Sequence, residues 1–268
     1  MEIRDKRLIL TGAAGGIGRR LAEALAARGG RMVLIDRERA ALEEVAGATG
    51  GHAVAGDLST VEGCTAAAEA ALDHLGEVDL LINLAGLNSF RNFDAEEPAA
   101  LERLIHVNLL APMLLTRAVL PGMIARGSGR IVNVGSIFGS IGFAWFTAYS
   151  ASKFGLRGFS EALRRELADT GVRVSYVAPR AVRTPMNDDA VMRMGAATGM
   201  NMDDPDVVAA RIIEAIDDDH KDTYIGFPES LFVRVNVMLP RLVDRALAEQ
   251  NRIARKFALR QYEEDSEG

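Results

Sequence analysis

The sequence predicts an α/β protein with a doubly wound parallel sheet in a single domain, followed by a C-terminal helical extension. Most of the chain consists of short apolar runs separated by stretches in which apolar residues recur at helical spacing. Because the apolar runs show no polar alternation, they are typical of strands that helices cover on both faces of a parallel sheet. A glycine-rich turn directly follows the first run, as it does in sheets that hold phosphate groups at this point.

The expected strands and helices alternate in the order that this fold requires. Strands are expected at residues 7–11, 31–36, 52–57, 79–86, 130–136, 172–179 and 222–227. Helices are expected between them at residues 19–28, 39–46, 61–75, 99–125 and 151–169. Gly29 and Gly30 end the first helix, and Pro112 is expected to kink the fourth. The domain is therefore expected over residues 1–228 and the helical extension over residues 229–268.

Composition and charge exclude several classes of protein. Of the 268 residues, 49% are hydrophobic and 25% charged, a balance typical of a globular chain and not of a disordered one. The net charge of −6 disfavours nucleic acid as a partner. Cys64 is the single cysteine and cannot form an internal disulfide, and the four histidines are scattered, so no metal site is expected. A reducing, cytoplasmic location is the expectation.

The glycine-rich turn, TGAAGGIG at Thr11–Gly18, is a candidate dinucleotide-binding site. Gly12 permits a tight turn after the first strand, and Gly16 and Gly18 let the backbone approach a diphosphate. The helix that follows offers unpaired N–H groups and a partial positive charge to that anion. The residues expected to bind the dinucleotide in this turn are Gly12, Gly15, Gly16, Ile17 and Gly18.

Two charged residues after the second strand bear on the type of dinucleotide. Asp36 lies where a carboxylate accepts hydrogen bonds from an adenosine ribose and repels a 2′-phosphate. Arg37 is a guanidinium that pairs with a 2′-phosphate or stacks on adenine in the alternative arrangement. Gly15 occupies the position where a second phosphate-binding cation would stand. The sequence therefore favours NAD and leaves NADP open.

Ser136, Tyr149 and Lys153 form a candidate catalytic group. Tyr149 and Lys153 are four residues apart, so they share one face of a helix. An ammonium near a phenol stabilises the phenolate and lowers the tyrosine pKa. Such a tyrosine exchanges a proton with an alcohol or carbonyl oxygen. A Tyr-x-x-x-Lys spacing alone is more often an exposed helical pair, and its combination with Ser136 and the glycine turn indicates catalysis.

Together these motifs resemble those of the short-chain dehydrogenase/reductase family, a Rossmann fold, from Lys6 to about Pro228. TGAAGGIG matches the family's T-G-x-x-x-G-x-G turn, and Ser136 precedes Tyr149 at the family's usual spacing. The resemblance implies a catalytic tetrad of Asn108, Ser136, Tyr149 and Lys153. It implies further cofactor contacts from Asp57, Leu58, Asn83, Ala85, Gly86, Tyr149, Lys153, Val182 and Thr184.

The resemblance also implies an NAD(P)-dependent oxidoreductase that interconverts a secondary alcohol and a ketone. Tyr149 would move the proton, and Lys153 would lower the Tyr149 pKa and bind the nicotinamide ribose. Ser136 would orient the substrate oxygen, and Asn108 would hold a water that connects Lys153 to solvent. An NADPH-dependent 3-oxoacyl reductase is the alternative that Arg37 favours. A catalytically silent dinucleotide-binding sensor or scaffold is a further alternative, which the intact tetrad disfavours.

The sequence departs from the family pattern at two positions. Leu84 replaces the second Asn of the N-N-A-G motif, and Arg180 replaces the glycine of the Pro-Gly turn after the sixth strand. Arg180 is either a solvated loop residue or a contact to an anionic or polar substrate group. The resemblance places a substrate lid at about residues 185–210. Its methionines suggest an adaptable apolar pocket and hence an apolar substrate.

The extension at residues 229–268 is amphipathic and basic. Leu231, Val235, Met238 and Leu242 recur at helical spacing, and residues 229–260 hold seven basic and three acidic side chains. One interpretation is a helical pair that packs on the domain or on a sister subunit of a homodimer or homotetramer. The alternative is peripheral contact with a membrane or a lipid-carrying partner.

Overall fold

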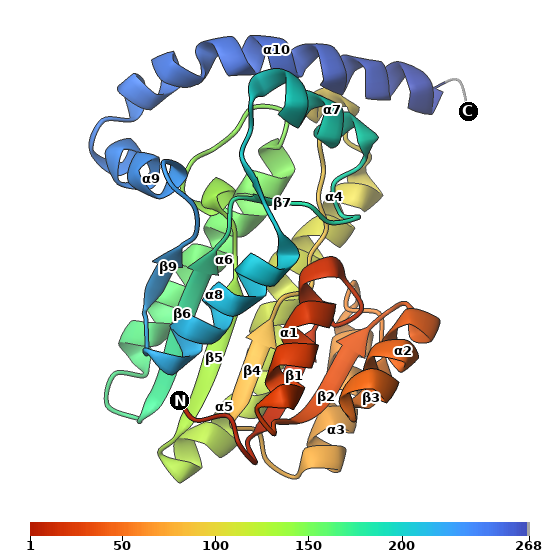
Figure 1. The fold of residues 1–268 in the computed structure, drawn as a ribbon, viewed down its shortest axis with the longest axis vertical. Coiled ribbons are helices and arrows are strands. Elements are labelled where there is room, and N and C mark those ends of the chain that lie inside the picture. Colours follow the sequence, from red (N-terminus) through yellow and green to blue (C-terminus); the bar gives the residue numbers. More distant parts are fainter. Residues whose placement is uncertain (267–268) are drawn as a thin grey trace.

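The computed structural model describes the backbone of residues 1–266 and the side chains of residues 1–258. Its main sheet is parallel, with strand order β3-β2-β1-β4-β5-β6-β9 and helices on both faces (Figure 1). The winding reverses between β1 and β4, and doubly wound sheets bind their ligands in the crevice beyond the carboxyl ends of the strands at such a point. The predicted fold class is confirmed.

The strands of the main sheet coincide with the predicted apolar runs. They are β1 (Arg7–Thr11), β2 (Arg31–Asp36), β3 (His52–Ala55), β4 (Leu80–Asn83), β5 (Gly129–Val134), β6 (Val172–Ala178) and β9 (Asp222–Tyr224). Several end earlier than predicted, because the residues after them leave the sheet and form the loops of the crevice. A separate two-stranded ribbon, β7 (Ala181–Val182) and β8 (Met202–Asp203), lies beyond β6.

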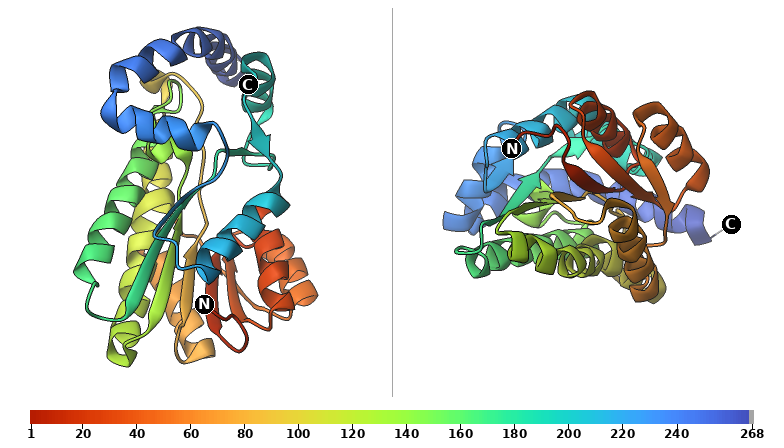
Figure 2. Two further views of the ribbon diagram at one scale, coloured as in Figure 1. Left: turned by 60° about the vertical axis from the view of Figure 1, so that its left-hand side comes forward. Right: turned by 90° about the horizontal axis from the view of Figure 1, so that it is seen from below.

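The helices form one layer on each face of the sheet (Figure 2). Apolar residues of α1 (Gly16–Ala27), α2 (Arg39–Thr49) and α8 (Pro205–Asp217) pack in one core. Those of α3 (Val61–Leu75), α5 (Ala111–Arg126) and α6 (Thr147–Glu166) pack in the other. Leu8, Leu10, Ile9 and Leu81 of the sheet are fully buried between these two layers.

Close to Pro112, where the sequence predicts a kink, the helical run contains an irregular turn. α4 (Pro98–Ile105) continues through a π-helical turn at His106–Leu110 into α5. In an α-helix the carbonyl of Asn108 would accept a hydrogen bond from residue 112, and proline has no N–H to donate. The missing donor is a local reason for the wider turn at this point.

One helical run passes a membrane-span test based on length and composition alone. It is Pro98–Arg126, in which 44% of the most apolar window is buried. Leu115, Val119 and Met123 of this run lie in the core between α3 and the sheet. The run is therefore part of the layer that covers the sheet.

Two helices that the sequence reasoning did not predict follow the ribbon strand β7. α7 (Asp189–Thr198) lies over the crevice, and α8 begins at Pro205, where the Asp204 side chain caps it by accepting a hydrogen bond from the Asp206 N–H. Val208 and Ile212 of α8 are fully buried against the sheet. The predicted lid at residues 185–210 is therefore too long, because its last residues belong to the core.

The extension folds into α9 (Glu229–Met238) and α10 (Pro240–Ser266), which cross the carboxyl-end side of the sheet (Figures 1 and 2). Ala254 and Ala258 are fully buried against Phe90, Phe143 and Met194. The Trp145 indole N–H donates to the Asn251 carbonyl of α10 at 3.1 Å. The predicted extension also includes residues 267–268, which lie outside the described residues.

Candidate active site

A cleft of about 1070 Å³ lies at the carboxyl ends of the strands, between the glycine turn and the helices of the extension. Its walls include almost all of the residues that the sequence predicted to bind the cofactor or substrate. These are Gly12, Gly15, Gly16, Ile17, Gly18, Asp36, Arg37, Asp57, Leu58, Ala85, Gly86, Ser136, Tyr149, Lys153, Val182 and Thr184. Asn83 and Asn108 are the predicted residues that are not part of the wall.

Three glycines of the turn stand where a side chain would not fit. Gly12 has φ +70°, and a Cβ there would stand 2.9 Å from the Ala85 backbone. A Cβ on Gly18 would stand 2.0 Å from the Gly12 carbonyl oxygen, and one on Gly16 would stand 2.7 Å from the Thr184 methyl group. α1 begins in this turn, so its first N–H groups have no helical partner. The turn therefore fits a diphosphate held by backbone groups, and the residues present fit a dinucleotide.

The far end of the cleft is acidic. The Asp36 carboxylate accepts hydrogen bonds from the Ala14 N–H at 3.0 Å and the Glu38 N–H at 3.3 Å, which fix its position beside the turn. Arg37 pairs with Glu38, with 3.1 Å between Nε and Oε1. Hydrogen bonds from Ser59 lower the pKa of the Asp57 carboxyl below its usual value. Glu38 is not among the site residues that the sequence predicted, and its carboxylate is the partner of the Arg37 guanidinium.

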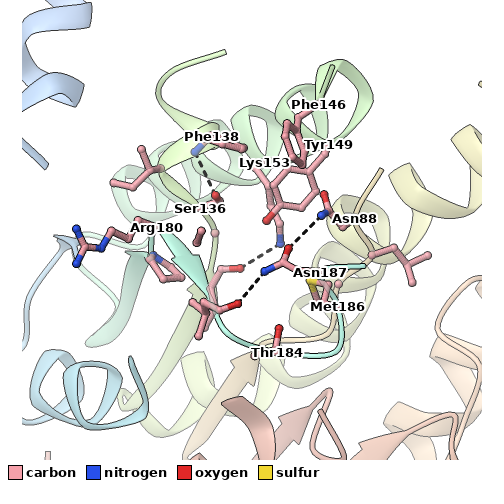
Figure 3. A pocket seen from close by; sticks show the side chains of 18 of the residues that line it. Asn88, Ser136, Phe138, Phe146, Tyr149, Lys153, Arg180, Thr184, Met186 and Asn187 are labelled. Carbon is pink, nitrogen blue, oxygen red and sulfur yellow. Dashed lines mark hydrogen bonds between the residues drawn. The ribbon is translucent and has the colours of Figure 1, made fainter. Parts of the chain in front are cut away.

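Ser136, Tyr149 and Lys153 converge in the middle of the cleft (Figure 3). Ser136 follows β5 and caps a short 3-10 turn, where its hydroxyl accepts a hydrogen bond from the Phe138 N–H at 3.1 Å. Tyr149 and Lys153 lie one turn apart on α6. The Lys153 ammonium donates to the Val134 carbonyl at 3.3 Å and stands 5.7 Å from the centre of the Tyr149 ring.

The charge state of this group differs from the expectation. Burial raises the pKa of Tyr149 above its usual value, and a hydrogen bond with Ser136 only partly opposes the rise. Burial also lowers the pKa of Lys153 to about 8. The expected lowering of the Tyr149 pKa by Lys153 is therefore not seen, because the lysine is itself desolvated and its ammonium donates to a backbone carbonyl. At neutral pH Tyr149 is a neutral phenol, which can donate a proton.

The buried ammonium leads to a prediction about stability. Lys153→Met should raise the free energy of unfolding of the cofactor-free protein by about 2 kcal/mol at pH 7, because it removes a buried charge and keeps most of the side-chain volume. The pKa of Lys153 is depressed from 10.5 to about 8 in the folded state. The gain should be complete below pH 8 and shrink towards pH 10.5, where the unfolded chain also loses the proton. Urea unfolding at pH 7 and pH 9.5 measures it, and an equal gain at both pH values would contradict the assignment.

Asn108 holds the loop after β4 in place. Its side chain accepts from the Leu87 N–H at 2.7 Å and donates to the Leu87 carbonyl and the Ser152 hydroxyl, both at 2.9 Å. This fully buried amide is therefore committed to protein partners. A water carried by Asn108 would have to be held by its backbone carbonyl, which Pro112 leaves without an α-helical donor.

Asn83 does not contact the cleft, in contrast to the expectation. Its side-chain amide donates to the side-chain Oδ1 of Asn133 at 2.8 Å and lies behind the cleft wall, between β4 and β5. Asn133 in turn donates to Ser160 of α6 at 2.9 Å. The side chain of Asn83 faces this buried network because alternate residues of a strand point to opposite faces of the sheet. It positions α6, which carries Tyr149 and Lys153.

The substrate half of the cleft is apolar and aromatic. Phe138, Phe143 and Phe146 surround Tyr149, with centroid separations from the Tyr149 ring of 6.3 Å for Phe138 and 6.5 Å for Phe146. Asn88 donates to Asn187 at 3.4 Å beside Met186, so two amides lie opposite the aromatic wall (Figure 3). The sequence reasoning did not assign the roof of this half to α9 and α10. The roof residues are Phe232, Val235, Leu242, Val243, Ala246, Leu247 and Gln250.

Arg180 does not present its guanidinium to the substrate. It bonds to Asp203 at 2.7 and 3.0 Å and to Glu229 at 3.0 Å, and in Figure 3 the group points away from Ser136 and Tyr149. Asn201 completes the cluster by donating to Glu229 at 2.9 Å. Arg180 therefore joins the turn after β6, the ribbon strand β8 and the first turn of α9. The two carboxylates explain why it is not available to an anionic substrate.

Removing this guanidinium should destabilise the protein. Arg180→Ala is expected to lower the free energy of unfolding by about 2 kcal/mol, because two largely buried carboxylates lose their partner. The loss should be smaller when Asp203→Asn is already present. Arg173→Ala, at a 62% exposed side chain, should cost less than about 0.5 kcal/mol. Urea unfolding of the single and double variants tests this, and strictly additive losses would refute the coupling.

Comparisons with known proteins agree with the geometry. The family described as short chain dehydrogenase matches residues 6–194. The chain is 34% identical to "Dehydrogenase/reductase SDR family member 7B" of Danio rerio over 94% of this chain and 87% of that protein. It is 36% identical to "Ketoacyl reductase HetN" of a Nostoc strain over 91% and 88%. Among solved structures, 3-ketoacyl-(acyl-carrier-protein) reductase from Brucella melitensis complexed with NADH superposes with a TM-score of 0.78, at 29% identity, over 85% of this chain and 99% of that one. The chain belongs to the short-chain dehydrogenase/reductase family of oxidoreductases.

Proposed function

We propose that this protein interconverts an apolar ketone and the corresponding secondary alcohol with NAD(H). The observation that carries the proposal is the convergence of Ser136, Tyr149 and Lys153 between a dinucleotide-sized turn and an aromatic pocket. A catalytically silent sensor or scaffold would have no need of these three side chains together, so their convergence favours an enzyme. Because the Tyr149 phenol is neutral at pH 7, it can act as the proton donor that ketone reduction requires.

The side chains have separate roles in this reaction. The cofactor, when bound, supplies the hydride for the carbonyl carbon. The Ser136 hydroxyl, fixed by Phe138, donates a hydrogen bond to the substrate oxygen. Tyr149 transfers its phenolic proton to the same oxygen, and the nearby Lys153 ammonium offsets the negative charge left on the ring. The aromatic side chains around Tyr149 exclude water from the reacting atoms.

The charges at the far end of the cleft support NAD(H) over NADP(H). Asp36 is held by two backbone N–H groups beside the glycine turn, where it would repel a 2′-phosphate. Arg37, the cation that could attract the phosphate, is already paired with Glu38. Relatives with either cofactor have been solved, including one described as a complex with NADH and one described as a complex with NADP.

A second candidate substrate class is the 3-oxoacyl thioesters. Two observations support it: relatives are described as ketoacyl reductases, and apolar side chains of α9 and α10 line the cleft. Oxidation of NADH and NADPH should therefore be measured with a panel of cyclic ketones, long-chain ketones and 3-oxoacyl thioesters. Turnover of the ketones with NADH supports the proposal, and turnover of the thioesters with NADPH supports the alternative. Tight NADH binding without turnover of any compound would instead indicate a sensor.

Oligomerisation and location belong to the same proposal. Exposed apolar side chains on α4, α5 and α6 support a homodimer or homotetramer that covers them, namely Ile105, Met113, Ile124 and Phe154. Cys64 is buried and unpaired, which is compatible with a reducing cytoplasm.

A further inference from the structure

The junction of α9 and α10 exposes an unusual number of large apolar side chains. We call this group the apolar corner; it consists of Val237, Met238, Leu239 and Leu242 at the junction, together with Phe227 and Leu231 at the other end of α9. Met238 is 80% exposed, Phe227 76% and Val237 67%, so these side chains meet few protein atoms. Scattered apolar residues are normal on a surface, but such a concentration along one short helix and its junction with the next marks a contact surface.

The outer face of α10 carries a row of positive charges next to this corner. We call it the basic stripe; it consists of Arg241, Arg245, Arg252 and Lys256, all exposed. Their spacing places them on one side of the helix, opposite the buried Val243, Ala254 and Ala258. None of the four has an ion pair among the described residues. Of the two exposed acids on the same segment, Asp244 and Glu249, Glu249 lies on the face of the stripe, between Arg245 and Arg252.

The cleft opens at the apolar corner. Phe232 and Leu242 line the cleft, and yet they are 44% and 54% exposed. Val235 and Leu247 lie deeper on the same helices and also line the cleft. Apolar surface is therefore continuous from the exposed corner, along the inner faces of α9 and α10, to the aromatic side chains around Tyr149.

We infer that α9 and α10 dock this protein on the surface of an anionic lipid bilayer. The apolar corner enters the boundary between headgroups and acyl chains, and the basic stripe contacts the anionic headgroups. The mouth of the cleft then faces the bilayer, so an apolar substrate can move between the two without crossing water. The transfer of an apolar substrate from the bilayer rests on the proposed function, whereas the binding of vesicles does not.

Charge and shape favour a bilayer over other partners. In a two-fold contact of this face with a second copy, the basic stripes would lie on the same interface and repel each other. An acidic protein would satisfy the stripe, but it gives no reason for side chains as exposed as Met238 and Phe227. A bilayer offers anionic groups and an apolar layer at adjacent depths, which is the combination that this face presents.

Flotation of the full-length protein with vesicles tests the inference. Binding is expected to vesicles of phosphatidylcholine with about one-third phosphatidylglycerol, to weaken with salt, and to be much lower with phosphatidylcholine alone. A stripe variant (Arg241→Gln, Arg245→Gln, Arg252→Gln) should lose about fivefold per arginine. A corner variant (Val237→Ser, Met238→Ser, Leu239→Ser) should lose at least about tenfold. A control variant with changes elsewhere on the surface (Arg39→Gln, Arg173→Gln, Val207→Ser) should bind as the unmodified protein does.

A labelling experiment reports insertion directly. Cys64 is buried and its thiol pKa is raised to about 11, so a single exposed cysteine can be labelled selectively. An environment-sensitive fluorophore on Met238→Cys should shift to the blue with anionic vesicles, and one on Asp73→Cys, at the far end of the molecule, should not. Absence of vesicle binding, or equal binding by the stripe, corner and control variants, would overturn the inference. So would a corner variant that dissociates an oligomer in vesicle-free sizing chromatography, because the corner would then be a subunit interface.

Discussion

Replacing Tyr149 by Phe is expected to lower kcat by about 100- to 10,000-fold, the usual contribution of a general acid. The neutral phenol stands beside Ser136 in the cleft, and the substitution removes its proton while keeping the ring that packs against Phe138 and Phe146. Cofactor affinity should change little. Steady-state kinetics with the best ketone from the panel, together with titration of NADH fluorescence, separates the two effects.

Two further variants make this experiment specific. Ser136→Ala should also lower kcat, because it leaves the substrate oxygen with one hydrogen-bond donor fewer. Phe146→Leu keeps the pocket apolar and should act mainly on KM. A Tyr149→Phe enzyme with kcat within a few-fold of the unmodified protein would rule out Tyr149 as the proton donor.

Replacing Asp36 by Ala is expected to shift the ratio of catalytic efficiencies with NADH and NADPH by at least about tenfold towards NADPH. Two unit charges about 4 Å apart interact by roughly 4 kcal/mol at an effective dielectric of 20, and solvent reduces this for a partly exposed carboxylate. Even about 1.4 kcal/mol corresponds to a tenfold preference. Efficiencies of the unmodified protein and the variant with both cofactors measure the shift.

The structure supplies controls that separate charge from geometry. Asp36→Asn removes the charge and keeps an oxygen that can accept from the Ala14 N–H, although it loses the hydrogen bond from the Glu38 N–H. It should shift the preference in the same direction. Glu38→Gln releases Arg37 and should raise the efficiency with NADPH while Asp36 is intact. Equal or better use of NADPH by the unmodified protein would show that Arg37 dominates and that the NAD assignment is wrong.

The sequence by itself determined the sheet and the location of the cleft. A buried parallel strand is a continuous apolar run, and each β–α turn is short, so local patterns fix both the strands and the residues at their carboxyl ends. Gly12, Gly16 and Gly18 were predictable because steric exclusion acts within the turn and its nearest neighbours. Tyr149 and Lys153 were predictable because one helical turn brings them together whatever surrounds them.

Only the tertiary structure decided the features that depend on residues far apart in the chain. Arg180 is bound by Asp203 and Glu229, which are 23 and 49 residues away, and no local pattern records that pairing. The pKa of Lys153 depends on how completely its surroundings exclude water, which spacing on a helix does not reveal. The amphipathic pattern of the extension predicted helices, but an apolar stripe does not specify what covers it. The extension lies above Tyr149 because α10 packs against α7 and the aromatic cluster. These partners are far from α10 in the sequence, so the local pattern does not select them among the apolar surfaces of the protein.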